Sequence, residues 1–138
     1  MNLVIFTDGA ARGNPGHAAI GYLITDGKNE LESGGEYIGV TTNNEAEYRA
    51  LIKALDEAKK YKPEEIICYS DSKLMISQLN REWKIKAPQL MDYFNDVMKM
   101  KEDIKIKFRH VRRTNPGIQR CDRLANKAID RHFYSQNK

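Results

Sequence analysis

The 138-residue sequence has few of the residues on which several common kinds of site depend. Its two cysteines, Cys68 and Cys121, stand far apart and outside any CxxC or Cys/His spacing, so a structural zinc site is not expected and both thiols should be reduced and partly buried. The apolar run at the N-terminus, Leu3 to Phe6, is too short for a membrane span or a secretory leader. Motifs of serine hydrolases and P-loop enzymes are also missing. These absences favour a cytoplasmic protein with no membrane partner.

The composition is that of an ordinary globular domain. Charged residues make up 30% and hydrophobic residues 41% of the chain, which predicts one domain over 1–138, with 135–138 as a frayed tail. The net charge of +4 fits a polyanionic partner, although good solubility alone would explain it.

The basic residues are unevenly distributed. Between Lys101 and Arg113 there are six Lys or Arg against two acids, and three basic residues flank the single tryptophan, Trp83. Those three are Arg81, Lys84 and Lys86. This pattern suits a nucleic-acid groove, and it suits a solvated helix end and strand face equally well.

Two hydrophobic periodicities alternate along the chain and predict an α/β fold. Strands are expected at 3–7, 18–25, 30–38, 66–70 and 104–109. Helices are expected from a Thr42 cap to Pro63, from Ser72 to Leu79, from Pro88 onward, and after the turn 114–117. The first three strands should form an antiparallel sheet, and the strand–helix–strand order predicts parallel pairing of the first and fourth strands.

Four acids, Asp8, Glu47, Asp71 and Asp122, stand where a predicted strand ends or a predicted helix begins. Asp8 and Asp71 follow adjacent parallel strands, whose carboxyl ends border a crevice. Glu47 lies one turn before Leu51, on the flank of its helix's apolar face, and Asp122 is expected to start the last helix. Clustered carboxylates repel one another unless cations lie between them, so the pattern predicts a divalent metal site.

The local motifs around these acids resemble the type 1 ribonuclease H (RNase H) family over nearly the whole chain. Each motif alone is common turn or cap chemistry, but four in order at compatible spacing are specific. They are Thr7-Asp8-Gly9 with Gly13-Asn14-Pro15-Gly16, Thr42-Asn43-Asn44 before Glu47, Ser70-Asp71-Ser72, and Arg120-Cys121-Asp122 before Leu124-Ala125.

The resemblance implies a ribonuclease H-like fold, in which a five-stranded mixed sheet is flanked by helices. It also implies that Asp8, Glu47, Asp71 and Asp122 are a catalytic tetrad that binds two Mg²⁺ ions, for which Mn²⁺ can substitute. The implied activity is that of an endoribonuclease, which hydrolyses the RNA strand of an RNA/DNA hybrid by a two-metal-ion mechanism and leaves 5′-phosphate and 3′-hydroxyl ends. A monomer without a protein partner is expected.

The resemblance also implies substrate contacts. Asn14 and Asn43 are expected near the RNA strand, and Thr42 and Asn44 toward the DNA strand. Further candidates are Trp83, Arg12 and Lys73; Trp83 would pack on a DNA sugar with the neighbouring basic residues on phosphates, or else lie in the core.

The chain departs from the family pattern in two places. Many members carry a histidine in the loop before the last helix, whereas 112–119 contains none, so His110, Arg112 and Arg113 are possible auxiliary residues. The segment after Asp71 is compact and lacks the basic protrusion of some bacterial members.

Two other functions remain open at this stage. The same fold carries integrase and transposase domains that act on DNA, against which Asn14, Asn43 and the fourth acid favour a hybrid nuclease. Alternatively, the chain binds hybrids without cutting them, as the missing loop histidine would allow. For each acid alone, a turn or helix-cap role is sufficient.

Overall fold

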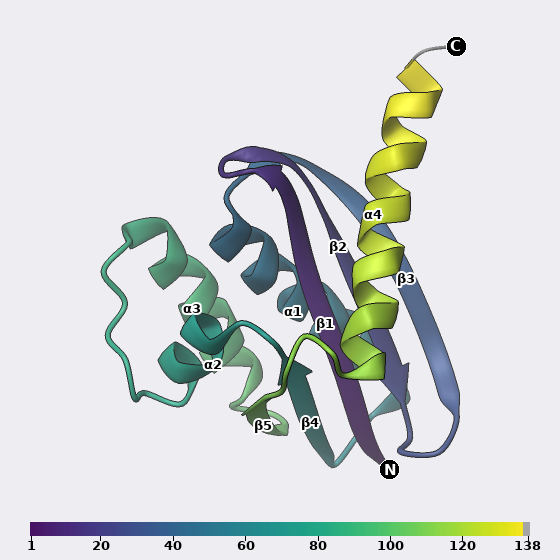
Figure 1. Ribbon diagram of the computed structural model, residues 1–138. Helices are drawn as coiled ribbons and strands as arrows, with labels where there is room; N and C mark the ends of the chain where they lie inside the picture. Colours follow the sequence, from purple (N-terminus) through teal and green to yellow (C-terminus); the bar gives the residue numbers. More distant parts are fainter. Residues whose placement is uncertain (137–138) are drawn as a thin grey trace.

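The computed structural model describes residues 1–136 and contains one five-stranded mixed sheet in the order β3-β2-β1-β4-β5 (Figure 1). The strands are β1 (Asn2–Gly13), β2 (Gly16–Thr25), β3 (Glu30–Thr41), β4 (Glu65–Ser70) and β5 (Lys105–His110). β1, β2 and β3 are antiparallel, and β4 and β5 add in parallel beside β1. The predicted fold class and the parallel pairing of the first and fourth strands are confirmed.

β1 is longer than its apolar run predicts. The Asp8-Gly9 pair, expected to end the strand, lies inside it, because β2 pairs with β1 as far as Gly13 opposite Gly16. β4 pairs with β1 only as far as Phe6 opposite Tyr69. Beyond that point the β4 side of β1 is open, and Asp8 is the second residue of the open segment.

Helices cover both faces of the sheet. On one face lie α1 (Asn43–Ala58), its short 3₁₀ extension η1 (Lys59–Tyr61), α2 (Lys73–Leu79) and α3 (Pro88–Met100). The long α4 (Pro116–Gln136) packs across β1, β2 and β3 on the other face (Figure 1). No helix within residues 1–136 has the length and apolarity to cross a membrane.

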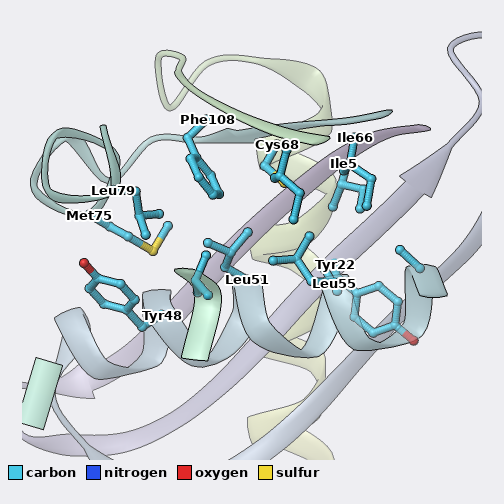
Figure 2. Close-up of a cluster of buried hydrophobic side chains, with 14 of the residues drawn as sticks. Ile5, Tyr22, Tyr48, Leu51, Leu55, Ile66, Cys68, Met75, Leu79 and Phe108 are labelled. Carbon is cyan, nitrogen blue, oxygen red and sulfur yellow. The ribbon is translucent and has the colours of Figure 1, made fainter. Parts of the chain in front are cut away.

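The main core lies between the sheet and α1. Leu3 and Ile5 alternate with less buried neighbours along β1 and belong to the same buried cluster as Leu51 and Leu55 of α1, which recur at helical spacing. Figure 2 shows Ile5 on the side of the sheet that faces Leu51 and Leu55. A smaller cluster of Ala19, Ala125, Ala128 and Ile129 lies under α4. Its small side chains let α4 lie close to the sheet. Both cysteines are free, as predicted, and they are fully rather than partly buried.

The beginning and the end of α4 differ from the sequence-based prediction. The turn formers at 114–117 are partly helical: the Asn115 side chain accepts hydrogen bonds from the backbone N–H groups of Gly117 and Ile118 at 2.9 and 3.4 Å, so the helix begins at Pro116. Asp122 is therefore inside the helix and does not start it. Ser135 and Gln136, predicted to fray, belong to α4, and 137–138 lie outside the described residues.

Candidate active site

Two of the four acids lie where the pairing between β1 and β4 ends. Asp8 lies on β1 just past the last β1–β4 pair, and Asp71 follows the last residue of β4. Both are shielded from solvent: Asp8 is 7% exposed, and the Asp71 side chain is 14% exposed. The predicted crevice at the carboxyl ends of adjacent parallel strands is where these two carboxylates meet.

Glu47 enters the same place from α1. Its Oε1 accepts a hydrogen bond from the backbone N–H of Gly9 at 2.6 Å, on the segment of β1 that β4 leaves unpaired. A Cβ on Gly9 would lie 2.3 Å from the Ala46 carbonyl carbon and 2.5 Å from the Glu47 nitrogen. Only glycine lets the helix backbone approach β1 this closely, so Gly9 determines the distance of Glu47 from Asp8.

A second glycine positions Asp122. Gly21 lies opposite Asp8 in the β1–β2 register, and a Cβ there would lie 2.0 Å from the carbonyl oxygen of Cys121. The α4 backbone therefore rests on β2 beside Asp8, which brings the next residue, Asp122, to the cluster. Asp122 is exposed, unlike Asp8, and forms the solvent side of the site.

The acids line one open cleft. Carboxylate oxygens of Asp8, Glu47 and Asp71 all lie within 4.8 Å of one another. They border a cleft of about 460 Å³. Its other lining residues are Gly9, Ala10, Ala11, Asn43, Arg113, Ile118, Gln119 and Asp122.

Burial and mutual repulsion make the carboxylates unusually basic. Burial, then the charges of Glu47, Asp71 and Asp122, raises the pKa of Asp8 far above its ordinary range. Burial also raises the pKa of Glu47, and the Gly9 N–H opposes this only in part. The cluster is thus destabilised by its own negative charge when all its members are ionised.

The nearest basic side chain does little to neutralise this charge. The Arg113 Nε lies 3.8 Å from an Asp71 oxygen, but the Arg113 side chain is 93% exposed and its charge is screened by water. Several oxygen ligands around an open cleft are the donor set that hard divalent cations such as Mg²⁺ prefer. The residues present therefore fit a divalent metal.

Among the predicted substrate residues, three surround the start of α1. The Asn14 side chain accepts a hydrogen bond from the Asn43 backbone N–H at 3.0 Å, and the Thr42 hydroxyl caps the helix by accepting from Glu45 N–H at 3.2 Å. Asn43 lines the acid cleft directly. The hairpin end of β1–β2 and the N-terminus of α1 are thus joined beside the acids.

A second cleft contains the next two candidates. Asn44 and Trp83 line it together with Lys84 and Lys86. Trp83 is 48% exposed, so it is not a core residue, and its loop between α2 and α3 faces solvent.

The remaining candidates lie around the site. Lys73 is exposed at the start of α2, two residues after Asp71. Arg12 is engaged by α4: it forms an ion pair with Asp130 at 2.8 Å. His110 is exposed at the end of β5, beside Ser70 in the strand register, and is not among the residues that line the acid cleft. Arg112, also exposed, precedes Arg113 in the loop to α4.

The sequence analysis did not identify Gly9 and Gly21, the glycines that let α1 and α4 approach the sheet closely. It also did not identify Gln119, which lines the cleft. A glycine's close approach depends on which helix crosses which strand, and the sequence gives no direct signal for that. The Asp8–Gly21 pairing could have been found by counting back from the β1–β2 hairpin.

Comparisons with known proteins agree on one family. A family model described as RNase H matches residues 1–130. A bifunctional protein of Mycobacterium tuberculosis is 38% identical over 133 residues, which are 94% of this chain and 36% of the relative. The chain therefore spans about a third of that relative's length. Ribonuclease H of Polaromonas naphthalenivorans is 37% identical over 146 residues, covering 95% of this chain and 89% of the relative.

Solved structures give the same result. A crystal structure of LC11-RNase H1 in complex with an RNA/DNA hybrid superposes with a TM-score of 0.90 at 38% identity, covering 95% of this chain and 99% of the other. RNase H1 from the halophilic archaeon Halobacterium salinarum also gives a TM-score of 0.90, at 35% identity and the same coverage.

Proposed function

The chain belongs to the ribonuclease H family, and on that premise we propose that it is an endoribonuclease that hydrolyses the RNA strand of RNA/DNA hybrids. The observation that carries the proposal is the meeting of three carboxylates, from β1, α1 and the end of β4, within 4.8 Å in an open cleft, with Asp122 of α4 at its rim. The relative solved with a hybrid supports the substrate class.

Asp8, Glu47, Asp71 and Asp122 would hold the divalent ions, Mg²⁺ or in its place Mn²⁺. When bound, such ions activate a water molecule for attack on the phosphate and stabilise the leaving 3′ oxygen, which gives 5′-phosphate and 3′-hydroxyl ends. The protein's contribution is to hold acceptor oxygens at fixed positions. The chain thus needs no covalent nucleophile, and its buried thiols are not in a position to act as one.

Asn14 and Asn43 would select the RNA strand. Their mutual hydrogen bond fixes the β1–β2 hairpin end against α1, and Asn43 lines the acid cleft, where the 2′-hydroxyls flanking a scissile phosphate would lie. A 2′-hydroxyl is the group that distinguishes RNA from DNA at one position, and an amide side chain can donate to it and accept from it.

The other strand would run over the start of α1 toward Trp83. Thr42 and Asn44 stand at that end, and Lys84 and Lys86 share a cleft with Asn44 and Trp83. The exposed indole offers a flat apolar surface for a deoxyribose, and the ammonium groups are suited to phosphates. Lys73 is a further phosphate contact in this proposal.

Arg113 would take a supporting role in place of the family's loop histidine. It is the basic group nearest to Asp71 and lines the cleft, so it can stabilise negative charge on a bound phosphate. A guanidinium stays protonated and cannot act as a general base. Arg112 and His110 are secondary candidates.

The test is the cleavage of one labelled oligomer strand presented as RNA/DNA, RNA/RNA, DNA/DNA and single-stranded RNA, in Mg²⁺, Mn²⁺ or EDTA. We expect metal-dependent cutting of RNA in the hybrid alone, lost in Asp71→Asn and retained in Asp92→Asn, which removes an exposed acid of α3. Cleavage of duplex DNA with the hybrid intact would indicate a DNA-processing enzyme of the same fold. Binding of the hybrid without cutting in either metal would indicate a binding module.

A further inference from the structure

A row of residues on β1 and a row on α4 run side by side where α4 crosses β1, with charged or polar residues at the ends of the strand row and along the helix row. Asp8, Ala10 and Arg12 occupy alternate positions of the strand and therefore share its α4 face. Asp122, Asn126 and Asp130 recur every four residues along one side of the helix. The strand row from Asp8 to Arg12 spans about 13 Å and the helix row from Asp122 to Asp130 about 12 Å, so the two rows have nearly equal lengths. Asp8 therefore lies beside Asp122 and Arg12 beside Asp130, with Asn126 between the two pairs.

Asn126 connects the two ends of these rows. Arg12 Nη1 pairs with Asp130 at 2.8 Å, while Nη2 donates to Asn126 at its side-chain oxygen, 3.2 Å, and its carbonyl oxygen, 3.3 Å. The Asn126 side-chain nitrogen donates to the carbonyl of Asp122 at 3.0 Å and to its carboxylate Oδ1 at 3.2 Å.

The chemistry of the partners permits one orientation of this amide. A guanidinium only donates hydrogen bonds and a carboxylate only accepts them, so the Asn126 oxygen must face Arg12 and its nitrogen must face Asp122. Arg12 thereby fixes the direction in which Asn126 donates. An ionised Asp, the residue closest to Asn in size and shape, could accept from Arg12 but could not donate to Asp122.

Asp122 has more need of such support than the other acids. Asp8 is buried, and Glu47 is held by the Gly9 N–H, whereas Asp122 is exposed on a helix surface and, apart from Asn126, its side chain has a hydrogen-bond contact with Asp8, a second acid. A partner that orients a ligating carboxylate reduces the entropy lost when the ion binds.

We propose that Asn126, held by Arg12, is a positioning residue that presents the Asp122 carboxylate to the divalent-metal site. This inference rests on the proposed function, because it presumes that Asp122 is a metal ligand. It also assigns Arg12 a structural partner on α4 rather than a phosphate of the substrate.

The experiment compares the parent chain with Asn126→Ala by calorimetric titration of Mn²⁺ into substrate-free protein and by hybrid cleavage as a function of metal concentration. Loss of an outer-shell partner typically costs about 10–100-fold in metal affinity or activity, and we expect about tenfold weaker Mn²⁺ binding. Cleavage at low metal should fall by a similar factor and recover at high metal, with KM for the hybrid unchanged. Alanine is a better helix former than asparagine, so the variant should fold.

Two further variants separate positioning from helix docking. Asp130→Asn weakens the ion pair of Arg12 but leaves the hydrogen bonds that join Asn126 to Arg12 and to Asp122, so its Mn²⁺ affinity should equal that of the parent. Arg12→Lys keeps the charge opposite Asp130 but loses the second guanidinium nitrogen, which donates to Asn126. Its Mn²⁺ affinity should therefore lie between those of the parent and Asn126→Ala.

Unchanged Mn²⁺ affinity in Asn126→Ala, in a parent that cleaves hybrids, would overturn the positioning role alone. An equal loss in Asp130→Asn would also overturn it, since general docking of α4 would then be the cause. A parent that neither binds Mn²⁺ nor cleaves the hybrid would overturn the proposed function, and this inference with it.

Discussion

The carboxylate of Glu32 and the carboxylates of the acid cleft have opposite electrostatics. Glu32 of β3 accepts hydrogen bonds from the hydroxyls of Tyr22 at 2.8 Å and Tyr61 at 3.0 Å, and pairs with Lys60. Burial alone would raise the pKa of Glu32, but the bonds from Lys60, Tyr22 and Tyr61 outweigh it and lower the pKa. At the acid cleft, burial and the neighbouring acids raise the pKa values of Asp8 and Glu47.

The difference shows what separates a structural carboxylate from one available to a ligand. Glu32 finds its partners within the folded chain, and it joins β3 to Tyr22 of β2 and to Lys60 and Tyr61 of η1. Asp8 and Asp71 have few donors and face one another, so their charge is left to be balanced from outside. Five changes test this contrast, beginning with the largest expected effect.

Asp71→Asn should reduce hybrid cleavage by more than the roughly 100-fold that the loss of an outer-shell partner costs, because a direct oxygen ligand loses its charge. The fold should be retained, since no hydrogen bond of the sheet depends on this side chain. Single-turnover cleavage assays with circular dichroism would measure both. Near-normal turnover would refute the metal assignment and remove the contrast with Glu32.

Gly9→Ala should reduce cleavage without removing any carboxylate. Its new Cβ meets the α1 backbone at 2.3 Å, so the helix must move and carry Glu47 away from Asp8. Forcing extra atoms into a packed contact costs about 1–3 kcal/mol, which a urea titration would detect. Full activity together with a stability loss in that range would show that the site tolerates a displaced Glu47.

The pH dependence of stability should have opposite signs in the two groups. The raised pKa values of Asp8 and Glu47 mean that the folded, metal-free protein binds more protons than the unfolded chain, so stability is fullest below the ordinary carboxyl pKa near 4 and falls as the pH rises through the raised values. Glu32, with its lowered pKa, contributes above that range and loses its contribution in acid.

Asp8→Asn should therefore raise Tm in EDTA at pH 8, where about 1 kcal/mol corresponds to roughly 3–4 °C for a domain of this size. The gain should shrink at pH 5 and disappear in saturating Mg²⁺. A gain that is independent of pH and metal would mean that repulsion among the acids is not its source.

Glu32→Gln should cost stability and leave cleavage unchanged. The hydroxyls of Tyr22 and Tyr61 lose a charged acceptor, worth about 1–2 kcal/mol, while the exposed end of Lys60 adds little. Chemical denaturation and the hybrid assay together would measure this. A loss of activity comparable to that of Asp71→Asn would mean that this network also supports the site.

His110→Ala should have the smallest effect. A general base contributes about 100-fold or more, and the exposed position of His110 at the end of β5, outside the cleft lining, predicts a change far below that. A pH–rate profile of both proteins is the measurement. If the acidic or the basic side of the profile disappears in the variant, His110 is a catalytic acid or base.

The meeting of Asp8, Glu47 and Asp71 follows from local pattern. Asp8 and Asp71 could be brought together because parallel strands end on the same side, and Glu47 because helical spacing places it beside Leu51. The Thr42 cap was also predicted, and the Thr42 hydroxyl accepts from the Glu45 N–H. These features could be predicted because periodicity and capping depend only on residues that are close in sequence.

What was mispredicted depends on contacts between distant segments. Asp8-Gly9 has the composition of a turn, but pairing with β2 keeps it in the strand. Asn115-Pro116 was interpreted as a loop, but the asparagine caps α4, so Asp122 lies well inside the helix. The contacts of Arg12 with Asp130 and Asn126 were not predicted, because they depend on where α4 crosses β1.

The orientation of Cys121 has a consequence for which ions the cleft accepts. This cysteine immediately precedes Asp122, yet its Sγ turns away to hydrogen-bond the carbonyl of Phe6 at 3.2 Å, and burial, followed by the charge of Asp8, raises the pKa of its thiol. The sulfur thus stays protonated and offers no soft ligand beside the acids. With oxygen donors alone, the cleft should discriminate against thiophilic ions such as cadmium, which a thiolate at this position would attract.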